Sequence, residues 1–161
     1  MIDYAGNEIR YNGDCPSCSF ANHEFELPCG IIYEDEICHV AQDWELPIPN
    51  FVVVAPKRHV ELMMELTCEE KDRIFNIVNK VITIMHNKIG VNRINCLYKE
   101  LENRHFHIWI WSRDGWKEKG INPILDMRKL MEYAKDNMRI VENFEGIKRT
   151  VGIMREELKQ V

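Results

Sequence analysis

The segment His105–Trp111 reads His-Phe-His-Ile-Trp-Ile-Trp, and it constrains the fold more than any other part of the chain. Its side chains alternate, with aliphatic and Phe side chains in one set and two His and two Trp side chains in the other. A period of two predicts a strand whose apolar face packs on a core while His105 and His107 project from the opposite face. Core strands rarely carry two imidazoles on one face, so we interpret this face as part of a functional site. Two hydrogen-bonded structural histidines are the alternative.

The composition is that of an ordinary globular protein. The chain has 161 residues, of which 45% are hydrophobic and 29% charged, and this fits one domain with an appendage. A formal net charge of −5 argues against a nucleic-acid-binding surface. The longest apolar runs, such as residues 51–56, are far shorter than the roughly 20 residues that cross a bilayer. The first residues lack the basic and apolar regions of a signal peptide, so we expect a cytoplasmic protein without a membrane partner.

Further patterns predict a sheet. Residues 30–33 and 38–41 flank an acidic turn and predict a hairpin. Residues 51–55 are apolar throughout, which predicts a strand covered on both faces. Residues 93–98 and 104–112 predict two more strands that lie together, and residues 10–30, rich in Asn, Gly, Pro and Ser, predict a loop.

One long helix is predicted over residues 68–89. Thr67 and Glu70 form the pattern of a capping box, apolar residues follow at helical spacing, and Gly90 suits the position after the last turn. After Gly120 the pattern changes, and Asn122-Pro123 opens an amphipathic helical segment. Another helix is expected over the last dozen residues.

The six cysteines are expected to be reduced, because no secretion signal is evident. Cys38, Cys68 and Cys96 are interpreted as small buried hydrophobic residues. Cys15-Pro16-Ser17-Cys18 differs, because two residues between thiolates let both sulfurs face one metal ion. A redox dithiol or a chance pair are the alternatives, and the polar loop that follows disfavours the redox reading. A metal would need two more ligands from elsewhere in the chain.

The six histidines divide into two groups, three with a candidate function and three without. His59 follows the predicted strand 51–55, where it could be a surface side chain in a basic turn or could project into a cleft. His105 and His107 lie about 7 Å apart at Cα, so one could bind a metal while the other attacks phosphorus through a neutral ring nitrogen. A structural or solvent-exposed role is expected for the others, which are His23, His39 and His86.

Taken in order, these motifs resemble the histidine-triad (HIT) superfamily of nucleotide hydrolases and transferases. The resemblance covers about residues 10–115 and rests on the Cys15-x-x-Cys18 pair, Ile32–Asp35, Asp43 with its Pro-containing loop, Phe51–His59, the capped helix, Asn95 and His105-x-His107-x-x-x-x-Ser112-Arg113. It implies an α+β fold with a mainly antiparallel sheet, one long helix and a helical C-terminal extension. We expect a HIT domain over residues 1–118 and an extension over 119–161 packed on the same domain.

The resemblance also implies a cofactor. Zinc-bearing relatives bind the metal through the two cysteines, the His after the Pro-Lys motif and the first His of the triad. In this chain these are Cys15, Cys18, His59 and His105, which would form a closed structural zinc site.

The resemblance further implies a reaction. His107, the middle His of the triad, is expected to attack the α-phosphorus of a nucleoside (poly)phosphate or phosphoramidate and to form a nucleotidyl-histidine that water then hydrolyses. Asp43 is expected to bind ribose hydroxyls, with Asn95 and Trp109 also at the substrate. Relatives usually dimerise by joining sheets, so a homodimer is expected, with a nucleotide as the ligand.

Three departures from the family pattern keep other functions open. Trp109 stands where the third His is expected, and an indole donates one hydrogen bond but cannot shuttle a proton. Residues 99–103 carry two acids that would repel a polyphosphate, and Asn50-Phe51 replaces a common Gly-His. The alternatives are therefore a nucleotidyltransferase or phosphorylase, and a non-catalytic nucleotide-binding protein.

Overall fold

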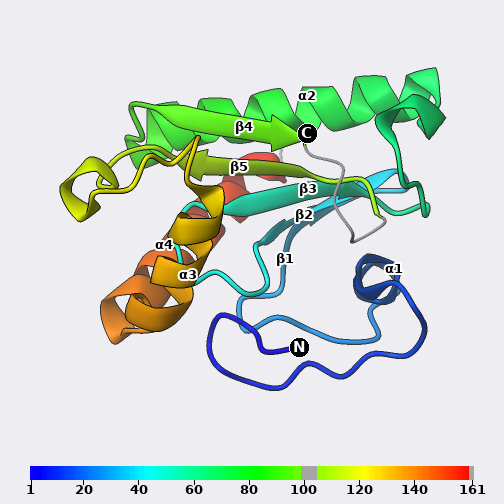
Figure 1. Cartoon of the computed structure of the whole chain (residues 1–161). Helices are drawn as coiled ribbons and strands as arrows, with labels where there is room; N and C mark the ends of the chain where they lie inside the picture. Colours follow the sequence, from blue (N-terminus) through cyan, green and yellow to red (C-terminus); the bar gives the residue numbers. More distant parts are fainter. Residues whose placement is uncertain (99–104, 160–161) are drawn as a thin grey trace.

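A computed structural model describes residues 1–98 and 105–159. Its centre is a five-stranded antiparallel sheet in the order β1-β2-β3-β5-β4 (Figure 1). The strands are β1 (Ile31–Glu34), β2 (Cys38–Gln42), β3 (Val52–Pro56), β4 (Ile94–Tyr98) and β5 (Ile108–Ser112). The helices are α1 (Pro16–Ala21), α2 (Cys68–Ile84), α3 (Met127–Asn137) and α4 (Val141–Leu158), with short helical turns at Met63–Glu65, Met85–Ile89 and Lys117–Lys119. The predicted α+β fold with a mainly antiparallel sheet is confirmed.

The long helix begins and ends where the sequence predicts. The Thr67 hydroxyl accepts a hydrogen bond from the Glu70 N–H at 3.1 Å, and the Glu70 carboxylate accepts one from the Thr67 N–H at 2.8 Å. These two bonds satisfy N–H groups that have no partner inside the helix. α2 continues into the π-helical turn Met85–Ile89. Gly90 ends it with φ of +83°, a conformation that favours glycine.

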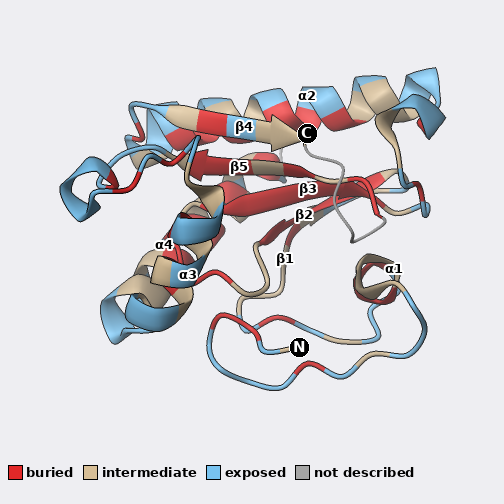
Figure 2. Cartoon of the chain, viewed as in Figure 1, coloured by how far each residue is buried: buried red, intermediate tan, exposed pale blue. Residues whose placement is uncertain are grey.

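One face of the sheet carries the main hydrophobic core, which α2 and α4 cover. In Figure 1, α2 runs along one side of the sheet, and Figure 2 shows β2, β3 and β5 as largely buried. Apolar side chains of alternate strand residues meet those of both helices; among them are Val40, Val54, Ile108 and Ile110 from the sheet, Ile74, Ile77 and Val81 from α2, and Ile147, Val151 and Met154 from α4. The predicted burial of residues 51–55 on both faces is confirmed, since all five are buried.

The other face is covered by the N-terminal segment, with α1, and by α3 (Figure 1). Phe20 of α1 packs edge-on against His39 of β2, with ring centroids 5.2 Å apart. A second cluster, in which Leu130 and Ala134 of α3 join Phe51 and Trp111, fills the space near the start of β3. The space between these two coverings is where the candidate site lies.

Several elements differ from the sequence-based expectation. Residues 10–30 contain the short helix α1, α3 begins at Met127 rather than at Asn122, and α4 has 18 residues rather than about a dozen. β5 begins at Ile108 because the chain before it leaves the ladder, with the Phe106 N–H bonded to the Val60 carbonyl at 2.6 Å. Residues 99–104 lie outside the described part, so the expectations for the acidic segment 99–103 stay predictions.

Two of the cysteine assignments are wrong, and one is right. Cys38 is fully buried in the core, but Cys68 and Cys96 are exposed. Cys68 lies in the first turn of α2, and Cys96 lies on β4, an edge strand of the sheet. Over residues 1–98 and 105–159, no helix has both the length and the apolar content to span a membrane.

Candidate metal centre and adjoining cavity

Four side chains from three distant segments meet at one end of the sheet. Cys15 and Cys18 come from α1 and the residue before it, His59 follows β3, and His105 precedes β5. The two sulfurs and one nitrogen from each imidazole lie within 4.8 Å of one another. The Cys15 Sγ to His105 Nδ1 distance is 3.3 Å, the Cys18 Sγ to His59 Nδ1 distance is 3.2 Å, and the Cys18 Sγ to His105 Nδ1 distance is 3.6 Å.

These distances fit a tetrahedral zinc ion. With Zn–S near 2.3 Å and Zn–N near 2.0 Å, a sulfur and a nitrogen ligand lie about 3.5 Å apart. Two thiolates and two imidazoles also match the donor set of structural zinc sites. Burial and the neighbouring Cys15 thiol raise the pKa of Cys18 to about 11, so a thiolate at this position needs a cation beside it. The cluster is therefore compatible with zinc.

The protein fixes which nitrogen of His105 faces the cluster. His105 is buried, and its Nε2–H donates to the Pro56 carbonyl at 3.0 Å. This bond leaves the Nδ1 lone pair for a metal, because a carbonyl that accepts from one ring nitrogen of a ligating His fixes which nitrogen faces the metal. Burial lowers the pKa of His105 to about 4, so the ring is neutral at pH 7 and can act as a ligand. α1 adds a further constraint, because the Cys18 N–H points at Cys15 Sγ at 3.5 Å.

A cavity of about 620 Å³ adjoins this cluster. Its floor is formed by Val53 of β3, Trp109 of β5 and His107, which precedes β5. Residues from the N-terminal segment, the loop after β2, the turn after β3 and α3 form its walls; they include Tyr11, Asp14, Ser17, Asp43, Trp44, Glu45, Glu61 and Met131. The volume suits a small-molecule ligand of nucleotide size.

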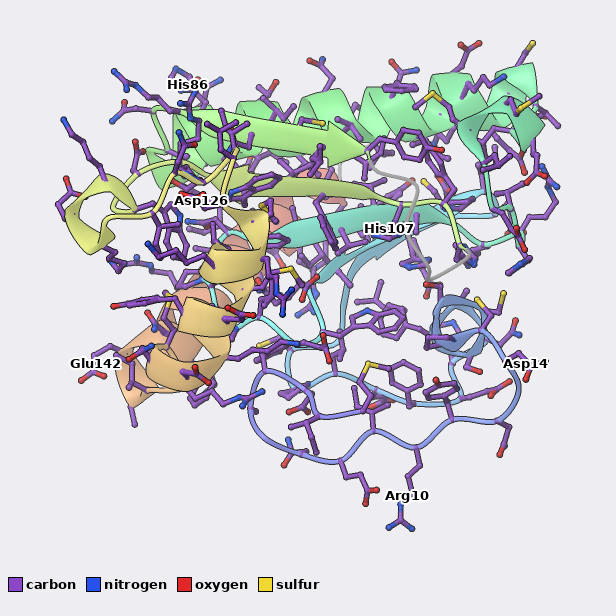
Figure 3. The ribbon with its side chains drawn as sticks, viewed as in Figure 1. Arg10, Asp14, His86, His107, Asp126 and Glu142 are labelled. Carbon is purple, nitrogen blue, oxygen red and sulfur yellow. The ribbon has the colours of Figure 1, made fainter. Side chains whose placement is uncertain are left out.

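His107 lies on this floor, and one of its ring nitrogens bonds to the backbone. Its Nδ1–H donates to the His105 carbonyl at 2.8 Å, which leaves the Nε2 lone pair free toward the cavity. Burial lowers the pKa of His107, so the neutral, nucleophilic form prevails at pH 7. In Figure 3, His107 lies between the sheet and the N-terminal segment that carries Asp14.

Asp43 lies at the opposite end of the cavity from the Cys/His cluster. It follows β2, and its N–H bonds to the Phe51 carbonyl at the start of β3, whereas His105 bonds to Pro56 at the end of β3. The Asp43 Oδ1 accepts the N–H groups of Glu45 and Leu46 at 3.1 and 3.0 Å. Burial outweighs these bonds and raises the pKa of Asp43 to about 6. The Oδ2 atom, which has no bond within the described chain, is available to a ligand.

The charges around the cavity are unusual for a phosphate site. Four carboxylates line it, from Asp14, Asp43, Glu45 and Glu61. Among the residues that the structure describes, no Lys or Arg lines it. The cavity therefore offers imidazoles and aromatic rings, but no fixed cationic side chain, to a ligand.

Of the residues expected at the substrate, Asp43, His107 and Trp109 line the cavity and Asn95 does not. The Trp109 ring lies 5.1 Å from that of His107 and 6.0 Å from that of Phe51. Asn95 is buried on β4, and its amide donates to the Pro123 carbonyl at 3.4 Å. That contact gives Asn95 a structural role that its position in the motif order did not reveal.

The sequence did not indicate Trp44, Glu45 or Met131 as cavity residues. Trp44 and Glu45 are neighbours of Asp43, so the sequence already placed them close to the site. Met131 lies in α3, which is distant in sequence from every motif, and a Met in an amphipathic helix is normally a core residue. Only the packing of α3 against the loop after β2 brings Met131 to the cavity.

Comparison with known proteins agrees with this fold. The HIT domain family matches residues 24–112, which is more than half of the chain, so the chain belongs to the HIT family. No relative was found among curated proteins.

Solved structures share the fold at low sequence identity. A Zn-bound histidine triad family protein from Mycobacterium smegmatis has a TM-score of 0.63 at 16% identity, covering 91% of this chain and 94% of its own. A HIT family protein from Bacillus subtilis has a TM-score of 0.59 at 23% identity, with coverages of 87% and 96%. A HIT-like protein from Bartonella henselae, described as involved in cell-cycle regulation, has a TM-score of 0.62 at 14% identity, with coverages of 92% and 99%.

Proposed function

We propose that this chain is a zinc-bearing nucleotide hydrolase that cleaves at the α-phosphorus of its substrate through His107. One observation carries the proposal: the His107 Nδ1–H is held by the His105 carbonyl at 2.8 Å, so the free Nε2 faces a cavity of about 620 Å³. A fixed tautomer with an exposed lone pair is what an imidazole nucleophile requires.

The reaction has two displacements. His107 Nε2 forms a bond to the α-phosphorus, and the bond from phosphorus to the leaving group breaks with its electron pair on the leaving group. An amine leaving group takes a proton from solvent as this bond breaks. Water then attacks the same phosphorus, loses its proton to solvent and displaces His107, which releases a nucleoside monophosphate. The His105 carbonyl would stabilise the positive charge on the imidazole in the intermediate.

The charge of the cavity favours one of the two substrate classes. A dinucleoside polyphosphate brings several negative charges next to the carboxylates of Asp14 and Glu61. A nucleoside phosphoramidate has a single phosphate, and its leaving group is an amine that becomes neutral or cationic. We infer that a phosphoramidate fits this site better.

Zinc would act as a structural cofactor. Four protein ligands fill a tetrahedron, so no coordination position remains for water or substrate. Cys15, Cys18, His59 and His105 would hold the metal and thereby fix the backbone of residue 105. Since that backbone accepts the His107 Nδ1–H, the metal site would support the orientation of the nucleophile.

Trp109 supports a second candidate, a nucleotide-binding protein without turnover. Its indole cannot transfer a proton to the leaving group, whereas its ring contributes an aromatic surface to the cavity. A nucleotidyltransferase differs only in the acceptor of the second step, which would be phosphate or a sugar phosphate in place of water.

The test compares wild type with His107→Ala on an adenosine phosphoramidate and on a dinucleoside tetraphosphate. We expect turnover of the phosphoramidate by wild type, a loss of about 10⁴-fold or more in His107→Ala, and AMP binding by both proteins. AMP binding without turnover by wild type would support the binding protein. Turnover that needs added phosphate or sugar phosphate would support the transferase.

We also propose a cytoplasmic homodimer in which two copies join their sheets. β1 and β4 are the edge strands of the sheet, and an unpaired edge is a template for a second copy. Light scattering of the purified protein tests this state, and a monomer at micromolar concentration would contradict it.

A further inference from the structure

The helix α3 lies outside the HIT match, which ends at residue 112, and yet it reaches the cavity. Building on the proposed function, we propose that α3 is the specificity wall of the nucleotide site. Met131 would contact the base of the nucleotide, and the Lys135–Glu45 ion pair would hold the loop that carries Asp43.

The position of α3 is fixed by burial. Leu130 and Ala134 are fully buried in the cluster that also contains Leu46, Phe51 and Trp111. Leu46 belongs to the loop after β2, and Phe51 precedes β3. α3 is therefore anchored on the same two segments that carry Asp43 and the cavity floor, and its place relative to them is set by a close-packed contact.

Met131 and Lys135 lie on one face of α3, because residues four apart are neighbours on a helix surface. Met131 is partly buried and lines the cavity. The Lys135 Nζ lies 2.8 Å from the Glu45 Oε2, and both side chains are about one-third exposed, at 35% and 38%. This face thus presents an apolar side chain to the cavity and a cation to its rim.

The ion pair acts on Asp43 through a short path. Glu45 is two residues from Asp43, and its N–H donates to the Asp43 Oδ1 at 3.1 Å. Lys135 on one side and the Asp43 carboxylate on the other hold residue 45 in place. Loss of the Lys135 cation would release this turn and with it the orientation of the free Asp43 Oδ2. Lys135 is thus a positioning residue, since it does not itself line the cavity.

The chemistry of this end of the cavity fits a nucleoside. Asp43 offers a carboxylate acceptor for hydroxyl groups, while Trp44 and Met131 offer an aromatic and a polarisable apolar surface for a base. The Cys/His cluster lies at the other end of β3, with His107 between the two ends. A nucleotide would therefore bind with its base against α3 and its leaving group toward Asp14 and Glu61.

The experiment measures binding of AMP and CMP by calorimetry, together with kcat and KM for the phosphoramidate. Met131→Ala should weaken AMP binding by about tenfold, and it should move the ratio of the AMP and CMP dissociation constants toward one. Lys135→Met should raise KM by about two- to fivefold with kcat unchanged, and Lys135→Arg should restore most of the loss. The matched control is Arg128→Met, which breaks the exposed Arg128–Glu132 pair on the same helix and should change neither constant.

The outcomes separate this inference from the proposed function. AMP binding without turnover would overturn the hydrolase, and the binding data would still support or overturn the role of α3. Unchanged constants in Met131→Ala and Lys135→Met, with thermal unfolding as in wild type, would overturn the role of α3 alone. A wild-type protein that binds neither nucleotide would overturn both.

Discussion

Replacing Asp43 by Asn should stabilise the protein and weaken its ligand binding at the same time. The pKa of Asp43 is about 6, against an ordinary value of 3.8, mainly because the carboxyl is buried. Between these two pH values the folded state binds more protons than the unfolded state, so the stability of the wild type falls as the pH rises. Asn carries no charge, and its side-chain oxygen can still accept the N–H groups of Glu45 and Leu46.

The magnitude follows from the size of the shift. A shift of about two units corresponds to about 3 kcal/mol over the whole window, at 1.36 kcal/mol per unit. Roughly half of this stability of the wild type is lost between pH 5 and pH 7.5. We therefore compare the free energy of unfolding of Asp43→Asn with that of wild type at two pH values. The advantage of the variant should be about 1.5 kcal/mol larger at pH 7.5 than at pH 5.

The assay is urea unfolding of zinc-loaded protein at several pH values, followed by tryptophan fluorescence. AMP binding, measured at pH 7.5, should weaken by about 10- to 100-fold in the same variant, because a charged hydrogen bond is worth about 1.5–3 kcal/mol. Asp14→Asn, at an exposed position on the cavity wall, should change the free energy of unfolding by no more than about 0.5 kcal/mol. A stability difference between Asp43→Asn and wild type that does not change with pH would refute the reasoning.

Three further predictions concern other parts of the molecule. Cys18→Ser should lower the zinc content, measured by mass spectrometry. It should also lower the melting temperature by about 5–11 °C, the equivalent of losing about 2.7 kcal/mol of metal binding, whereas His23→Ala, a change at an exposed histidine, should change neither quantity. Burial opposes ionisation of Asp35, but bonds from the N–H groups of Cys38 and Ile37, from Arg73 and from Tyr33 outweigh it and lower the pKa of Asp35 to about 2. Asp35→Asn should therefore lower the free energy of unfolding by roughly 1 kcal/mol at pH 7, after discounting for exposure. In urea unfolding this difference from wild type should persist above pH 4 and disappear near pH 2. Trp111 stacks on Phe51 at 5.3 Å and buries an Nε1–H that has no partner among the described residues. Thermal unfolding should therefore show Trp111→Phe within about 1 kcal/mol of wild type and Trp111→Ala about 3–5 kcal/mol less stable; equal losses in both variants would contradict this account.

The elements predicted most accurately are those whose signal is local. The capping box at Thr67, the apolar spacing that follows it and Gly90 define α2, because each acts within a few residues along the chain. The run 51–55 likewise predicts a central strand. The exposure of Cys68 and Cys96 was missed because it depends on which neighbours cover each position, and a free Cys is buried more often than not. Asn122-Pro123 suggested a helix start, but the Asn122 side chain accepts the N–H groups of Ile124 and Leu125 and forms a turn before α3 begins.

The sequence predicted those parts of the candidate site that carry a recognisable motif. The Cys-x-x-Cys pair predicted half of a candidate metal site, and the structure brings His59 and His105 to the same point, as the HIT resemblance implied. The contribution of α3 had no signal, because Met131 and Lys135 fit the pattern of an ordinary amphipathic helix. Contacts between distant segments are set by packing, and a single sequence does not record which apolar face meets which loop.

The substitution at position 109 changes less of the site than the motif alone suggests. The tautomer of His107 depends on the carbonyl of His105, and that carbonyl is positioned by a residue whose own ring is held by Pro56 and by the Cys/His cluster. None of these contacts involves Trp109. His107 therefore keeps its orientation without a third histidine. In the proposed reaction the cost would fall on the leaving group, which would receive no proton from position 109. A polyphosphate would leave as an anion without a proton, whereas an amine would have to take its proton from solvent. The preference for a phosphoramidate therefore rests on charge alone, because the carboxylates of the cavity would repel a polyphosphate.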